Sequence, residues 1–77
     1  MSELLGSAPL SNKALLCVGG ITKREAERVR EQGHDITGLG YYLFLADQSE
    51  PSKPIEVLAE FYSASAAEKV SRLLPSR

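Results

Sequence analysis

The sequence predicts a small α+β domain whose elements follow one another as strand, helix, strand, strand and helix. Short apolar runs without helical spacing indicate the strands. Two segments begin at a Ser or Thr that is followed three residues later by Glu, which is the capping-box signal of a helix start. With 77 residues, the chain has room for one domain with a thin core.

The N-terminal part of the chain has the composition of a loop, and the first strand follows it. Residues 1–12 mix Ser, Gly, Pro and Asn with isolated leucines, which predicts a loosely ordered arm. Residues 14–18 are all apolar and precede a Gly-Gly pair, so they predict a strand that is buried on both faces. We therefore expect one domain over residues 13–75, with residues 76–77 as a tail.

The middle of the chain predicts a helix, a loop and a second strand. Thr22 and Glu25 stand at capping-box spacing, and the helix is expected to end before Gly33, which suits the left-handed conformation that closes helices. The glycine-rich residues 33–40 predict a loop. Residues 41–46 are aromatic and aliphatic, and at that length they favour a strand.

The last third of the chain predicts a turn, a strand and a helix. Residues 47–54 contain two prolines and several other turn-forming residues. Residues 55–62 alternate in a way that is typical of a strand with two different faces. Residues 63–74 have small and apolar residues at helical intervals, and Pro75 marks the end of that helix.

The order of the elements also predicts how the sheet is arranged. A crossover between parallel strands is right-handed almost without exception, which predicts both helices on one face of the sheet. In the split β-α-β arrangement of ferredoxin-like folds, the third strand inserts between the first two. We therefore expect a three-stranded antiparallel sheet of order 1-3-2, ferredoxin-like without the fourth strand, with one face uncovered.

Composition and charge exclude several classes of function. Nine Lys and Arg residues against ten Asp and Glu residues give a net charge of −1, which argues against binding to nucleic acid. No apolar run approaches the ~20 residues that cross a membrane, and the acidic start of the chain is unlike a signal peptide. The single cysteine cannot form an intrachain disulfide. We therefore expect a cytoplasmic protein.

The candidate catalytic residues do not combine into a site. Cys17 lies inside an apolar run, where a thiol packs as a small hydrophobe and stays unreactive. The intervening helix, ~16 Å long, is expected to hold His34 and Asp35 far from this thiol. One histidine and one cysteine cannot supply a zinc cluster. We expect a protein that is not an enzyme and uses no metal or cofactor.

One turn could bind an anion. Gly19 and Gly20 stand just before the first helix, and Thr22, Lys23 and Arg24 stand at its start. Backbone amides and cations at a helix N-terminus are suited to binding a phosphate or a nucleotide. The spacing matches neither the P-loop nor the dinucleotide motif, so a turn without a ligand is the competing interpretation.

The uncovered sheet face is the other candidate site. Strand alternation selects Tyr42, Phe44, Leu58, Glu60 and Tyr62 as interface residues, and a shift of one residue would replace them with their neighbours. Acidic residues on this face and the absence of the RNA-contact motif argue against RNA binding. The expected partner is a protein or a second copy of the chain.

These observations favour a small non-enzymatic interaction or accessory module. Residues 14–18 carry no charge, so the edge of the first strand would be adhesive unless something covered it. We therefore expect the chain to self-associate as a homodimer through an open sheet face or edge. Two alternatives stay open: residues 1–12 cover that edge with their leucines, or the chain binds a phosphate-containing ligand at the glycine turn.

Overall fold

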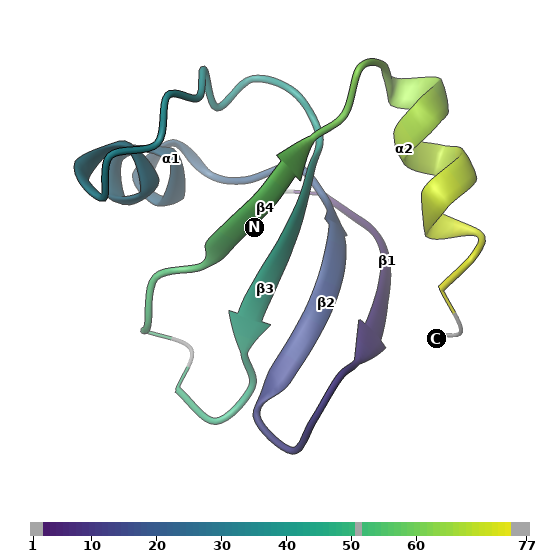
Figure 1. The fold of residues 1–77 in the computed structure, drawn as a ribbon, viewed down its shortest axis with the longest axis horizontal. Helices are drawn as coiled ribbons and strands as arrows, with labels where there is room; N and C mark the ends of the chain where they lie inside the picture. The colour runs from purple at the N-terminus through teal and green to yellow at the C-terminus, as the bar shows by residue number, and fades with distance from the viewer. Residues whose placement is uncertain (1–2, 51, 75–77) are drawn as a thin grey trace.

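The computed structural model describes residues 3–50 and 52–74 of the chain. They form an α+β fold with a four-stranded antiparallel sheet in the order β1-β2-β3-β4 and two helices (Figure 1). The elements are β1 (Leu4–Pro9), β2 (Ala14–Gly19), α1 (Lys23–Glu31), β3 (Tyr42–Asp47), β4 (Glu56–Glu60) and α2 (Ala64–Ser71). Each strand therefore pairs with the strands that precede and follow it in the sequence.

The predicted three-stranded sheet of order 1-3-2 is wrong, because two segments pair differently. Residues 4–9 lie within the expected arm but form β1, which pairs antiparallel with β2 and places Ser7 opposite Cys17. On its other side β2 pairs antiparallel with β3, with Phe44 opposite Cys17. The segment between β2 and β3 is therefore not a crossover between parallel strands, and the handedness rule does not apply to it. The sheet is not ferredoxin-like.

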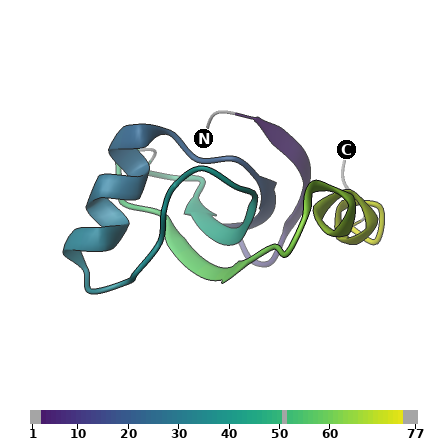
Figure 2. The same ribbon diagram turned by 90° about the horizontal axis from the view of Figure 1, so that it is seen from above.

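The two helices lie on opposite sides of the sheet (Figure 2), so the prediction that both cover one face is also wrong. Residues directly opposite each other on antiparallel strands share a face. Cys17 and Phe44 share one face and cluster with Ala26 of α1, so we call it the α1 face. Gly6 lies on the opposite face, where an added Cβ would be 3.0 Å from Ser71 of α2. We call that face the α2 face.

The larger part of the core lies between the sheet and α1. This cluster consists of Cys17, Ile21, Ala26, Val29, Tyr42, Phe44 and Ile55. On the α2 face, the buried residues are the smaller Ala8, Val18 and Ala67. Cys17 and Val18 are both 0% exposed, so β2 is buried on both faces, as its continuous apolar run predicts.

Side-chain caps fix where the helices begin. The Thr22 hydroxyl accepts a hydrogen bond from the Glu25 amide at 3.1 Å, and the Glu25 carboxylate accepts one from the Thr22 amide at 2.8 Å, which confirms the capping box. The cap of α2 is Ser63, whose hydroxyl accepts from the Ala66 amide at 3.1 Å. This cap comes before Ser65, the residue that the Ser-x-x-Glu spacing suggests.

Gly19 lies where the chain before β1 passes closest to β2. A Cβ at this position would overlap the carbonyl oxygen of Glu3, which accepts a hydrogen bond from the Gly20 amide at 2.7 Å. We expect Gly19→Ala to lower the free energy of unfolding by about 1–3 kcal/mol, because the backbone of β1 has to shift. Chemical unfolding curves measure this loss.

The matched control for this variant is Gly40→Ala. A Cβ on Gly40 would lie 3.6 Å from a side-chain oxygen of Glu60, which is an ordinary contact with a flexible group. Equal losses of stability in the two alanine variants would contradict the prediction.

The Asp47 carboxylate organises the turn between β3 and β4. Its Oδ1 accepts hydrogen bonds from the Ser49 hydroxyl at 2.7 Å, the Ser49 amide at 2.8 Å and the Glu50 amide at 2.9 Å. Lys53 Nζ lies 3.4 Å from Oδ2. These contacts, the Ser49 hydroxyl above all, lower the pKa of Asp47 from 3.8 to about 2.

This lowered pKa makes part of the stability depend on pH. Because the folded chain binds the Asp47 proton more weakly than the unfolded chain, the stabilisation is present above pH 3.8 and is lost as the pH falls toward 2. We expect Asp47→Asn to lack this component, as measured by unfolding curves on both sides of that window. If both proteins lose stability equally on acidification, Asp47 has no such role.

Candidate functional site

α2 covers only part of its face of the sheet, because it packs mainly on β1 and β2. Across one row of paired residues, Val18 is buried, Leu43 is half-buried and Ala59 is exposed. In the next row, Leu16 and Leu45 are opposite each other and both are half-buried, and the exposed Glu56 is opposite Leu45 on the other side. We call Leu16, Leu43, Leu45 and Ala59 the open half of the α2 face.

The side of α2 that faces the open half is also apolar. Ser71 lies over the edge strand β1, so the flank of α2 on the other side is directed toward β3 and β4 (Figure 2). Helical spacing puts Ala66, Val70 and Leu73 on that flank, which we call the α2 flank. Leu73 lies two residues after Ser71, the last residue of α2, and is 80% exposed. The apolar surface therefore continues from the sheet onto the helix.

β4 forms the other border of the open half. In the described part of the chain, its only strand partner is β3, so its outer edge is unpaired. Glu56 and Glu60 are exposed at its two ends, and Leu58 is the extra residue in a bulge opposite β3. Charges and bulges on an edge strand hinder pairing with further strands. The border is therefore acidic and a poor site for strand addition.

The structure separates the residues predicted to form an interface, which are Tyr42, Phe44, Leu58, Glu60 and Tyr62. The first two are 0% exposed, because they lie under α1 on the covered face of β3. The other three are at the surface. Leu43 and Leu45, one residue along from those selected by alternation, are half-buried on the other face of β3. Alternation gives the spacing along a strand but not which face a helix covers.

Burial of Tyr42 is compatible with its hydroxyl group because that group has partners. It accepts a hydrogen bond from the Gly38 amide at 2.9 Å and donates to Glu60 Oε2 at 3.5 Å. A Cβ on Gly38 would lie 2.7 Å from the Ala26 side chain, so glycine is required where this loop crosses α1. Glu60 therefore lies on the α1 face and supports the core there, whereas Glu56, which is opposite Leu45, lies on the α2 face.

The turn predicted to bind an anion consists of Gly19, Gly20, Thr22, Lys23 and Arg24. Two of its amides already have partners within the chain: the Gly20 amide donates to the Glu3 carbonyl, and the Thr22 amide donates to the Glu25 carboxylate. The Glu25 carboxylate thus lies at the N-terminus of α1, where an anion would be expected to bind. The two cations of the turn are exposed.

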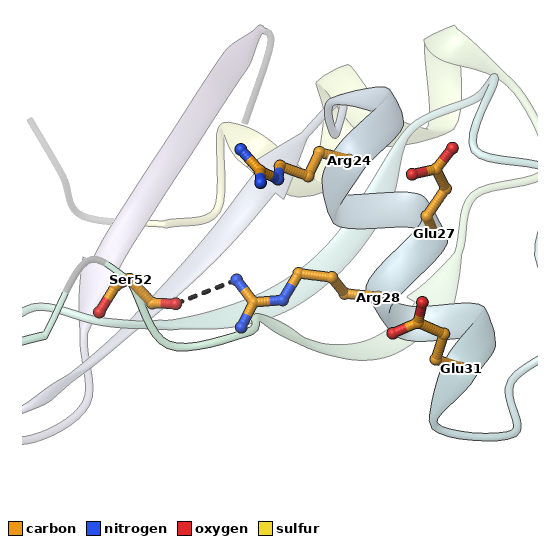
Figure 3. Close-up of a pocket in the computed structure, with 5 residues that line it drawn as sticks. All are labelled: Arg24, Glu27, Arg28, Glu31 and Ser52. Carbon is orange, nitrogen blue, oxygen red and sulfur yellow. Dashed lines mark hydrogen bonds between the residues drawn. The ribbon is translucent and has the colours of Figure 1, made fainter.

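Arg24 instead shares a surface depression with Arg28, one helical turn further along (Figure 3). The depression has a volume of about 640 Å³ and is lined by Arg24, Glu27, Arg28, Glu31 and Ser52. Arg28 Nη1 donates to the Ser52 carbonyl at 3.0 Å, and both arginines extend toward the β3–β4 turn. Within residues 3–50 and 52–74, neither arginine has an ion pair within 4.0 Å. Sequence reasoning missed this pair, although its i,i+4 spacing was visible.

The remaining chemistry-bearing groups form no reactive site. Cys17 is 0% exposed, and burial raises the pKa of its thiol, so the group stays protonated and unreactive. Over the described residues, no three His, Cys, Asp or Glu side chains are grouped to hold a metal ion. The same part of the chain contains no helix with the length and apolar character of a membrane span.

Comparisons with models of protein families, with curated proteins and with solved structures find no match to this chain. The case for a function therefore comes from two surfaces, which are the open half of the α2 face and the arginine pair of α1.

Proposed function

We propose that this protein is a small non-enzymatic interaction module that docks another protein chain on the open half of the α2 face. The observation that carries this proposal is the group of half-buried leucines, Leu16, Leu43 and Leu45, which α2 leaves partly exposed. Burial of apolar surface contributes about 25 cal/mol per Å². A contiguous apolar patch with a charged border is typical of a protein-protein interaction site.

The support for docking comes from this face and not from the edge of β2. β1 pairs along that edge, so residues 4–9 cover the uncharged strand that sequence reasoning expected to be adhesive. Among the described residues the sheet still ends in an unpaired edge at β4, where acidic residues and a bulge oppose strand addition. A face with partly exposed leucines and an edge that resists pairing together favour docking on the face.

Substitution of one leucine in the open half tests the proposal. We expect Leu45→Lys to weaken partner binding about tenfold or more, because burial of a leucine contributes ~1.5–3 kcal/mol. The immobilised chain is incubated with a cell extract that also contains the untagged chain, and the retained proteins are compared between variants. Circular dichroism shows whether the variant is folded.

Leu39→Lys is the matched control for this experiment. Leu39 is 91% exposed and lies near Lys23 and Arg30 of α1, away from the open half. A protein that is retained by the original chain and by this control, but lost with Leu45→Lys, supports docking on the open half. Identical retention by all three proteins would exclude this surface.

The arginine pair of α1 supports a second candidate function, which is binding of a phosphate-containing ligand. Guanidinium groups present several donors in one plane and bind phosphate through paired hydrogen bonds. Arg28 uses one nitrogen to hold the Ser52 carbonyl, which fixes the side chain beside Arg24. In this candidate the ligand binds along the side of α1 and not at the glycine turn.

Inorganic phosphate is the probe for the second candidate, followed by amide chemical shifts. We expect shifts around Arg24, Arg28 and Ser52 that Arg28→Gln reduces several-fold, because one of the two paired guanidinium groups is lost. Lys69→Gln on α2 is the control and should leave the shifts unchanged. Chemical-shift changes confined to Gly20 and its neighbours would show that phosphate binds at the glycine turn and not at the arginine pair. If no amide shifts in millimolar phosphate, both anion sites are rejected.

A further inference from the structure

We propose that the open half of the α2 face receives α2 of a second copy of this chain, so that the module is a symmetric dimer. The inference rests on the function proposed above and names the partner. It is carried by three features of the α2 face, which are its shape, the position of its apolar side chains and the sign of its charges.

The shape of the α2 face is self-complementary. α2 stands over β1 and β2, and the open half lies beside it over β3 and β4 (Figure 2). A two-fold axis that runs parallel to the strands, just outside this face, carries α2 of one copy over the open half of the other. Both helices then lie in one layer between the two sheets. The same patch contacts itself, so the contact closes at two copies.

The apolar side chains are placed where the two helices meet. In this arrangement the α2 flank, formed by Ala66, Val70 and Leu73, faces the same three residues of the other copy across the axis. Leu73 is 80% exposed in one copy, whereas Val70 is half-buried. The dimer therefore removes from water the largest apolar side chain of the flank.

The exposed side of α2 carries two cations, Lys69 and Arg72, together with Glu68, and the acidic Glu56 of β4 lies on the same sheet face as the open half. Lys69 and Arg72 are exposed, and in the part of the chain that the structure describes neither side chain has an ion pair. In the dimer their aliphatic stems lie over the leucines of the other copy, while their charged ends extend toward Glu56, which is opposite Leu45 and therefore on the α2 face. Each copy contributes both signs, so the attraction occurs twice.

The competing way to join two copies is edge-to-edge pairing of β4 with itself. Antiparallel pairing centred on Leu58 would place Glu56 of each copy opposite Glu60 of the other copy. Like charges that lie directly opposite each other destabilise a strand pair. The bulge at Leu58 also interrupts the regular ladder that such pairing needs. The charges of β4 thus oppose edge pairing, whereas Glu56, which lies on the α2 face, favours contact with α2.

A charge exchange between two variants tests this arrangement. The first variant is Glu56→Lys, which leaves the Glu60 contact with Tyr42 in place, and the second is Lys69→Glu with Arg72→Glu. Sedimentation equilibrium measures association of each variant alone and of an equimolar mixture. Each variant alone should associate about fivefold to tenfold more weakly than the original chain, since like charges then meet at both contacts.

The mixture should recover the original affinity, because both contacts of the mixed dimer again join opposite charges. Lys23→Glu on α1, which lies outside the proposed interface, is the control and alone should associate with the affinity of the original chain. A monomeric original chain at millimolar concentration, or a mixture without recovery, would overturn the dimer. If the chain is monomeric but retains another protein in a Leu45-dependent way, docking stands and the second copy is excluded as the partner.

Discussion

The fold depends on one strand, β2, that has to be covered on both faces. Cys17 and Val18 point to opposite sides and are both 0% exposed, so the sheet needs a helix on each side. α1 and α2 supply this cover, but they have nine and eight residues and each spans only part of a face. Uncovered apolar surface is therefore a consequence of how the core is divided, and the open half of the α2 face is where it remains.

The size of the side chains determines how each helix approaches the sheet. On the α1 face, Tyr42 and Phe44 fill the space below the helix, and the Tyr42 hydroxyl is held by the loop that returns the chain to β3. On the α2 face, Gly6, Ala8 and Ala67 are small, and the backbone of α2 comes close to β1. Because α2 lies close to the sheet, it stands as a ridge over β1 and β2 beside the uncovered surface of β3 and β4. This ridge and the lower surface next to it are the shape of the α2 face.

Local patterns in the sequence predict β2, β3, the start of α1 and much of β4, because each of these elements has its own apolar spacing or cap, whereas the capping-box spacing places the cap of α2 two residues late. β1 was missed because its Gly, Ser and Pro residues resemble a loop, and only pairing with β2 makes them a strand. The interface residues on β3 were displaced by one position, since the covered face depends on where α1 packs. The contact between Arg28 and Ser52 joins residues 24 apart and has no local signal.

The division of the core into a large and a small part also bears on dynamics. α2 is held by a few small side chains at the end of the described chain, whereas α1 is part of the main cluster. Local opening that releases α2 would leave that cluster intact, so amide hydrogen exchange should be faster in α2 than in β2 and β3. Such opening would expose Val18 beside the leucines of the open half. The chain would then present a sheet face free of its helix.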